Sequence, residues 1–511
     1  MDKSKKKTLE IRAEQSLVAS NSLYYFFRFL SKSFIAFIVS IFLVRFLGAI
    51  GYGIYTIVTI YWTLFLTFAA LGLGSAVQYG IAKYRANNKL GMLTWLVKHY
   101  LKILTISSII GSIAMFLLAG PIATVYRVPE MQGLIQILAL GLVFFAITES
   151  YAANVYIGYQ KMKYTFVSGV VFDALRLVQG AIVVFGFGLL GVIAFYDVIY
   201  IIVAMISLYF VYRLLRKNKT QKEIRVPKEE LSALHRYNWF SYGGNLIAYF
   251  YGAAISLLLG VFAPNLSSVS FFTVGWNLAA LIAMPAGALS SAFFSTNTKY
   301  FVKKQFDKFY EFMNLILRYV SMLTIPLAVG GIIAAGPLIS YFYRSSLSGA
   351  EIPLIIAIVA TFITALFNPW TNFLSAIGKQ KYFLYSSVIG AVIGIISTLV
   401  LVPILLAVGA ALVVLLSSTA ILATNLYFAS KYIKITMPYF VMLKVTLASL
   451  LMAGIIYPLE KVVSLFLLPF VLIGGFLTYI LVIYAMKVLT KNDINFFLKL
   501  SRLDKFLRLK T

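Results

Sequence analysis

The chain of 511 residues is 61% hydrophobic, with a mean hydropathy of +0.92 and a formal net charge of +28. A soluble globular protein cannot bury so much apolar surface, so this composition requires a lipid environment. The chain has no cysteine, and its two histidines, His99 and His235, lie far apart in the sequence. We therefore predict no catalytic residues, no metal ligands and no cofactor. The basic residues form short clusters between apolar runs, so nucleic acid is not an expected partner.

Apolar runs long enough to cross a membrane recur from one end of the chain to the other. About 20 helical residues span a hydrocarbon core of about 30 Å, and an α-helix satisfies its own backbone polar groups in lipid. The sequence therefore predicts an all-α polytopic membrane protein with about fourteen transmembrane helices, at residues 22–47, 54–79, 100–119, 134–157, 165–187, 191–212, 239–262, 270–292, 313–335, 353–376, 383–406, 409–429, 439–457 and 465–486.

The positions of the basic residues predict how these helices are oriented. If the N-terminus is cytoplasmic and the chain alternates sides, 35 of the 44 Lys and Arg fall in cytoplasmic segments and three fall in outer loops. Positive charge is enriched on the cytoplasmic side of membrane proteins. We therefore predict a multi-pass protein of the cell (cytoplasmic) membrane with both termini in the cytoplasm.

Short motifs recur at a nearly constant spacing and indicate an internal duplication. Ala119-Gly-Pro-Ile-Ala123 recurs as Ala335-Gly-Pro-Leu-Ile339, and Lys83-Tyr84 recurs as Lys299-Tyr300. Two parallel six-helix lobes related by a pseudo-twofold axis are expected, with a substrate cleft between them. The predicted organisation is an N-terminal tail (1–21), an N-lobe (22–212), a cytoplasmic linker (213–238), a C-lobe (239–430), two further helices (431–486) and a C-terminal tail (487–511).

Charged residues inside the predicted helices are the candidates for a functional site, because a charge at mid-bilayer costs about 2.5–3.5 kcal/mol. Three cations could bind an anionic head group, since an arginine fork bonds two oxygens at once: Arg28, Lys32 and Arg176. Three acids are candidates for ion coupling or for structural pairing: Glu149, Asp173 and Asp197.

Structural explanations of the same residues stay open. Arg28 could extend to the membrane interface, and Asp173 and Arg176, three residues apart, could pair on one helix. Glu149 could pair with an arginine of another helix. In the second lobe, Asn277 and Asn368 could contact a glycan, although amides also bond helices to one another.

Several segments resemble the polysaccharide transporter family (O-antigen or oligosaccharide flippases) of the multidrug/oligosaccharidyl-lipid/polysaccharide (MOP) exporter superfamily. The strongest likeness is Arg45-Phe-Leu-Gly-Ala-Ile-Gly-Tyr-Gly-Ile-Tyr55, followed by Leu71-Gly-Leu-Gly-Ser-Ala76 and Lys83-Tyr-Arg85. The resemblance covers the whole chain and implies a MOP/MATE-like fold. It also implies a flippase for polyprenyl-linked oligosaccharides, the precursors of polysaccharide biosynthesis, that works by alternating access.

The resemblance implies that the partners are a polyprenyl-(pyro)phosphate-linked glycan and membrane lipids. The acids inside the predicted helices make a coupling ion, H+ or Na+, a further candidate partner. We expect a monomer. The alternatives are a multidrug or other small-molecule antiporter and a lipid II flippase, both of the same superfamily. A membrane glycosyltransferase, a polysaccharide polymerase or a scaffold is a further alternative. An enzyme is not favoured, because the predicted outer loops are short and hold only Glu130, Glu351 and Glu460 as acids.

Overall fold

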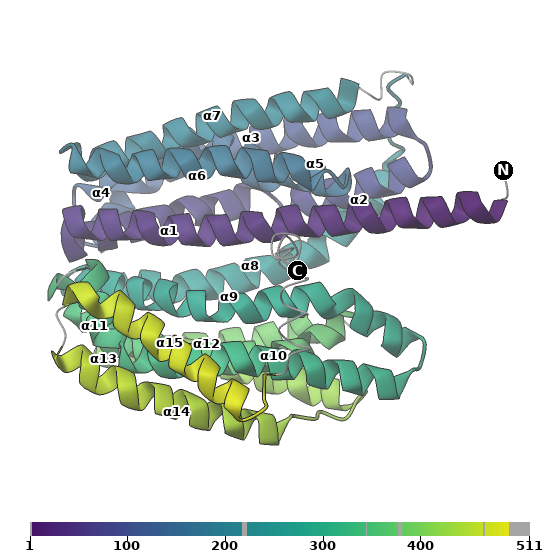
Figure 1. The fold of residues 1–511 in the computed structure, drawn as a ribbon. Helices are drawn as coiled ribbons and strands as arrows, with labels where there is room; N and C mark the ends of the chain where they lie inside the picture. Colours follow the sequence, from purple (N-terminus) through teal and green to yellow (C-terminus); the bar gives the residue numbers. More distant parts are fainter. Residues whose placement is uncertain (1–2, 217–221, 344, 377–380, 463–464, 490–511) are drawn as a thin grey trace, which may run out of the picture. The chain divides into compact units, whose positions relative to one another are not determined.

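The computed structural model describes residues 3–216, 222–343, 345–376, 381–462 and 465–489 (Figure 1). Every regular element in these ranges is a helix, as expected for a chain whose backbone polar groups must be satisfied in lipid. Part of the predicted linker, residues 217–221, and most of the predicted C-terminal tail, from residue 490 on, lie outside the described residues.

The helices follow one another with short connections. The first half of the chain forms α1 (Lys3–Ala69), α2 (Leu73–Ala86), α3 (Leu90–Val125), α4 (Met131–Phe145), η1 (Ala146–Ala152), α5 (Ala153–Gly158), α6 (Met162–Val184), α7 (Gly188–Arg216) and α8 (Lys228–Phe262). The second half forms α9 (Ser267–Val302), α10 (Phe306–Ile333), α11 (Ala335–Tyr343), η2 (Ser345–Ala350), α12 (Glu351–Ala376), α13 (Lys381–Ser430), α14 (Tyr439–Val462), η3 (Leu465–Leu467) and α15 (Leu468–Ala485).

The predicted fold is confirmed by the lengths of these helices. Within the described part of the chain, eleven helices are long and apolar enough to cross a membrane. Two of them, Ser31–Ala69 and Lys381–Ser430, contain an internal kink and each covers two predicted spans. A further predicted span falls in α8, whose apolar part is Tyr251–Phe262. About fourteen membrane crossings therefore follow.

The kink in α1 lies at Gly48, where φ is 70° and ψ is −179°. A residue with a β-carbon rarely adopts this conformation, whereas glycine does so readily. The predicted break between the first two spans, after residue 47, coincides with this glycine. The kink in α13 lies at Leu406, again at the predicted break between two spans.

The chain packs into two compact units. Unit 1 comprises Met1–Val274 and Ser387–Val413, and unit 2 comprises Gly275–Ser386 and Val414–Thr511. Unit 1 thus holds all of the predicted N-lobe together with the linker and α8. The predicted lobe boundaries are not tested by this packing and stay a prediction.

Aromatic side chains join the helices at the centre of unit 1. The ring of Trp62 on α1 is buried, with its centroid 4.2 Å from that of Phe145 on α4 and 5.2 Å from that of Tyr200 on α7. Stacked and edge-on rings at such distances add attraction beyond the burial of apolar area. This core holds α1, α4 and α7 together beside the charged residues of α6.

Tyrosines bond α8 to the second half of α1. The hydroxyl of Tyr242 donates to the carbonyl of Thr67 at 3.2 Å, and that of Tyr249 donates to the carbonyl of Ile60 at 3.0 Å. The two tyrosines are seven residues apart on α8, as are their acceptors on α1. Two turns of an α-helix take about seven residues, so one face of α8 lies along one face of α1.

In unit 2, two cations bind backbone carbonyls just beyond the end of α15. Arg318 Nη2 donates to the carbonyl of Val488 at 2.6 Å, and Lys444 Nζ donates to that of Met486 at 3.1 Å. The last carbonyls of a helix lack partners within the helix, and cations near them are favourable. Arg318 and Lys444 therefore tie α10 and α14 to the end of α15.

Candidate functional site

Arg28 on α1 and Asp173 on α6 form an ion pair inside unit 1. Arg28 Nη1 lies 2.7 Å from Asp173 Oδ2, and the two side chains are only 14% and 7% exposed. Ser31, one turn after Arg28, donates from its hydroxyl to the same oxygen at 2.5 Å. Arg28 is therefore paired with an acid in the interior of the unit.

The side chain of Arg28 crosses α6 at Gly169. A β-carbon at Gly169 would overlap the Nε and Cδ atoms of Arg28, so only glycine leaves room for the arginine. Gly169 and Asp173 are four residues apart and share one face of α6. That face therefore carries both the space for the arginine and its counter-charge.

Arg176 lies one helical turn after Asp173 but does not pair with it. Arg176 Nη1 donates to the hydroxyl of Tyr55 on α1 at 2.9 Å and also to Oε1 of Gln179. Its guanidinium carbon lies 4.6 Å from the centre of the Tyr196 ring on α7, a cation–π distance. We call Tyr55, Arg176, Gln179 and Tyr196 the Arg176 cluster. The within-helix pair of Asp173 with Arg176 is not formed.

Gln179 holds the Arg176 cluster to the backbone of unit 1. Its side chain is fully buried, and its Nε2 donates to the carbonyl of Val192 on α7 at 2.7 Å. The amide oxygen is then left pointing at Arg176. The Gln179 amide thus forms hydrogen bonds through both its nitrogen and its oxygen, and the bond through the oxygen orients Arg176.

Arg176 has no carboxylate partner among the residues that the structure describes. Its Nε and Nη2 atoms make no hydrogen bond to any of those residues either. Arg176 is half-buried as a residue, and its Nε and Nη2 atoms are not among the fully buried unpaired atoms of the described residues. An unneutralised arginine at membrane depth, with donors to spare, can bind two oxygens of an anionic group.

Lys32 and Glu149 are the other predicted site residues with no ion pair in the described part of the chain. Lys32 is exposed on α1, one turn after Arg28, and Glu149 is half-buried. Glu149 lies in the π-helical segment η1, a geometry that often marks functional sites. Glu149 and Arg176 both interact electrostatically with the hydroxyl group of Tyr200, so they belong to one neighbourhood.

Asp197 on α7 forms no ion pair with these cations. It is 8% exposed and packs against α4 at Gly141, where a β-carbon would overlap its Oδ1 atom. Oδ1 has no hydrogen-bond partner, and Asp197 has no ion pair, among the residues that are described.

The two predicted glycan contacts lie in unit 2. Asn277 on α9 and Asn368 on α12 are both half-buried.

Within unit 1, the structure brings together Arg28 with Asp173, and Arg176 with Tyr55. Three members of the Arg176 cluster were not identified from the sequence: Tyr55, Gln179 and Tyr196. Only the spacing of Gln179 three residues after Arg176 signalled a contact.

A bundle of this size, with charged side chains held among apolar helices, defines a polytopic membrane transporter. The chain belongs to the polysaccharide biosynthesis protein family, whose model matches residues 18–300. The MatE family model matches residues 241–400. Family and fold together identify a membrane transporter of the flippase kind in the MOP superfamily, which confirms the resemblance predicted from the sequence.

Known proteins resemble the chain over most of its length. The lipid II flippase MurJ of Bacillus subtilis (strain 168) is 23% identical over 455 residues, which cover 82% of this chain and 83% of the relative. A solved structure of lipid II flippase MurJ in an inward closed conformation has a TM-score of 0.68 at 13% identity and covers 91% of this chain and 98% of that one. An inward-facing multidrug resistance MATE family transporter of the MOP superfamily has a TM-score of 0.60 at 14% identity, with 78% and 93% covered.

Proposed function

We propose that this protein is a flippase that moves a polyprenyl-linked oligosaccharide across the cytoplasmic membrane by alternating access and catalyses no covalent change. The observation that carries the proposal is Arg176, a half-buried arginine without a carboxylate partner among the described residues. The proposed cargo bears a phosphate or pyrophosphate between its lipid and its glycan. That group supplies the anion that Arg176 lacks.

The arrangement of donors supports binding of a phosphate. A guanidinium has five N–H donors in a planar fork, and Tyr55 and Gln179 use only those on Nη1. The edge formed by Nε and Nη2 matches the spacing of two phosphate oxygens. The ring of Tyr196 lies under the guanidinium and keeps its plane fixed. We assign Arg28 a structural role, because Asp173 already neutralises it.

Two further contacts belong to this proposal. Lys32 supplies a second cation for the anionic group, because its side chain is exposed and makes no ion pair with a described residue. Asn277 and Asn368 are the proposed glycan contacts. Coupling to H+ or Na+ is assigned to Glu149 in preference to Asp173, since Asp173 is bonded to Arg28 and Glu149 is bonded to no described residue.

A lipid II flippase is the second candidate function. It is favoured by the 23% identity to the Bacillus subtilis relative of that name. A lipid-linked cargo with an anionic linkage fits Arg176 in either case, so the two candidates differ in the glycan. An antiporter of cationic drugs is opposed by Arg176, because its unpaired charge repels such cargo.

The test is a flipping assay with the purified full-length protein in liposomes. The probe is a fluorescent polyprenyl-pyrophosphate disaccharide, and a reductant outside the vesicles reports the leaflet in which it lies. Losing a charge-assisted bidentate contact of about 1.5–3 kcal/mol lowers the flipping efficiency of Arg176→Gln by about 10- to 100-fold. Arg176→Lys keeps the positive charge and loses the planar fork of donors. Its flipping efficiency is therefore expected to lie between that of Arg176→Gln and that of the unmodified protein.

Arg213→Gln is the matched control, because Arg213 is an exposed arginine near the end of α7. It is expected to flip the probe at the rate of the unmodified protein. Arg176→Gln protein that is folded and still flips the probe at the control rate would contradict the proposal. Competition by lipid II, compared with competition by a lipid-linked oligosaccharide without peptide, separates the two candidate cargoes.

A further inference from the structure

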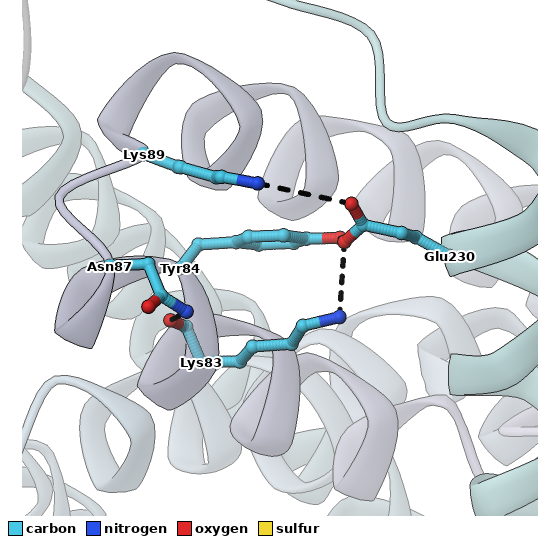
Figure 2. A network of polar contacts seen from close by, with 5 residues as sticks. All are labelled: Lys83, Tyr84, Asn87, Lys89 and Glu230. Carbon is cyan, nitrogen blue, oxygen red and sulfur yellow. Dashed lines mark hydrogen bonds and ion pairs between the residues drawn. The ribbon is translucent and has the colours of Figure 1, made fainter.

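The start of α8 is bonded to the turn between α2 and α3. Figure 2 shows that Lys83, Tyr84 and Lys89 all point at the carboxylate of Glu230. Lys83 Nζ and the Tyr84 hydroxyl each lie 3.0 Å from Oε2, and Lys89 Nζ lies 4.0 Å from Oε1. The carboxylate thus has a separate partner on each side. Glu230 is 146 residues from Tyr84 in the sequence, so the contact joins distant parts of the chain.

A second set of contacts lies a few residues earlier, before α8 begins. Lys98 on α3 pairs with Glu223 at 2.5 Å, and the amide of Ile224 donates to the carbonyl of Gly91 at 3.3 Å. The backbone passes so close to Gly91 that a β-carbon there would overlap the carbonyl oxygen of Lys222. Residues 222–224 therefore contact α3 through their backbone as well as through the side chain of Glu223.

Apolar and ring contacts close the same interface. Val226 and Leu234 are almost fully buried, although both belong to a polar, basic segment. The ring of His235 lies 5.8 Å from that of Tyr100, which also contacts His99 at 6.0 Å. The two histidines of the chain, distant in sequence, thus meet on one tyrosine. A linker that served only as a flexible tether would not bury such residues.

We propose that residues 222–235 form a strap that fastens α8 to α2 and α3, so that α8 moves with the first six predicted spans. Three of the four ion pairs among the described residues belong to the strap. Further along α8, Tyr242 and Tyr249 continue the attachment on α1. The helix α8, which begins the second repeat, therefore moves together with the first repeat. The predicted linker is then not the hinge of alternating access. This inference does not depend on the identity of the cargo.

The absence of native cysteine makes the strap directly measurable. Spin labels on Ala86→Cys at the end of α2 and Ala233→Cys on α8 occupy two exposed positions on either side of the contact. In full-length protein in lipid nanodiscs, pulsed electron spin resonance is expected to give one narrow distance distribution. Glu230→Lys places a third cation beside Lys83 and Lys89, so the distribution is expected to broaden and extend to longer distances.

Two further variants make the result specific to Glu230. The exchange Lys83→Glu with Glu230→Lys restores an ion pair and is expected to restore most of the narrow distribution. Glu229→Lys makes the same charge change at the adjacent, exposed position, and Glu229 has no partner among the described residues. It is expected to keep the narrow distribution. Equal distributions for Glu230→Lys and Glu229→Lys would overturn the proposal, as would a broad distribution in the labelled protein with no other change.

Hydrogen exchange gives a second measurement that does not depend on the labels. Neutralising one partly exposed ion pair in Glu230→Gln is expected to raise the exchange rate of the Ile224 amide by about two- to fivefold. Glu229→Gln is expected to leave that rate unchanged. An Ile224 amide that exchanges at the rate of an unprotected peptide in the unmodified protein would also overturn the proposal.

Discussion

The carboxylate of Asp173 lies 2.7 Å from Nη1 of Arg28, 145 positions earlier in the chain, and not against Arg176, one turn away on the same helix. The two arginines therefore have different environments. Arg28 is neutralised by an acid, whereas Arg176 is surrounded by tyrosines and an amide. This difference separates a cation that holds helices together from one that remains available to a ligand.

The pair between Arg28 and Asp173 is expected to behave as one energetic unit. Arg28→Met or Asp173→Leu alone leaves a buried charge without its partner and is expected to lower the free energy of unfolding by about 2–4 kcal/mol. The double variant removes both charges, so its loss is expected to be smaller than the sum of the two. Thermal unfolding in detergent measures all three variants. Simple additivity would show that the two side chains are not coupled.

Gly169 is expected to tolerate no side chain. In Gly169→Ala, the new methyl group displaces Arg28, and overpacking of this kind costs about 1–3 kcal/mol. Gly133→Ala on α4 is the matched control, because nothing lies within 4 Å of a β-carbon there. Alanine favours a helix by about 0.5–1 kcal/mol over glycine, so the control is expected to unfold at the same or a higher temperature. Equal unfolding temperatures for the two variants would contradict the packing argument.

Tyr55→Phe tests the orientation of Arg176 without changing any charge. The variant removes the hydroxyl that accepts from Arg176 Nη1, a hydrogen bond to a charged group of about 1.5–3 kcal/mol. We expect the half-saturating concentration of a polyprenyl-pyrophosphate probe to rise by about tenfold or more, with the unfolding temperature little changed. Tyr209→Phe, at an exposed tyrosine of α7, is the control. A binding curve equal to that of the control would show that Tyr55 does not position Arg176.

Acid is expected to release the strap in two steps. The hydrogen bond from Lys83 is the main reason why the pKa of Glu230 lies below its ordinary value of 4.5. The contribution of Glu230 to the docking of the strap is therefore complete above pH 4.5, and it is lost as the pH falls through the lowered pKa. Burial lowers the pKa of His235 from 6.5, so docking favours the neutral imidazole and weakens as the pH falls below 6.5.

The labelled pair at residues 86 and 233 reports both steps as a function of pH. His235→Phe is expected to reduce the step that begins near pH 6.5, and Glu230→Gln is expected to abolish the step below pH 4.5. His99, which contacts the same Tyr100 ring, remains in the His235→Phe variant. Lys83, Lys89 and Tyr84 are the groups that face Glu230. A docked fraction that rises as the pH falls would contradict the assigned signs.

The helical fold was predictable because it follows from local properties of the chain. Each predicted span is an apolar run of suitable length, and the break after residue 47 coincides with the positive φ of Gly48. Such features need no knowledge of which helices are neighbours. The non-helical backbone angles at Gly48 and Leu406 likewise divide α1 and α13 at the predicted breaks.

The candidate site was predictable only in part. The cost of charge in lipid directed attention to Arg28, Asp173 and Arg176. Which acid pairs with which arginine depends on contacts between α1 and α6. The spacing of three residues left a pair of Asp173 with Arg176 open and could not decide it. Tyr55 and Gln179 were missed because a tyrosine or an amide in an apolar run is equally typical of a packed core.

The contacts of His99 and His235 with Tyr100 show the same limit in a polar region. The two residues are distant in the sequence and carry no spacing typical of a shared site. Their meeting on Tyr100 depends on where the strap docks, which is a long-range property of unit 1. Glu223 and Glu230 likewise read as ordinary acids of a basic linker until their lysine partners are known.

The bonds from Tyr242 and Tyr249 to α1 have a consequence for how this protein can diverge. Both phenols donate to main-chain carbonyls, at Thr67 and Ile60, so neither bond depends on the side chain at its acceptor. Homologues can therefore exchange residues 60 and 67 for others of similar bulk and still keep this attachment, provided that the two tyrosines persist. Substitutions are therefore restricted at Tyr242 and Tyr249 on α8, and they are less restricted at positions 60 and 67 of α1.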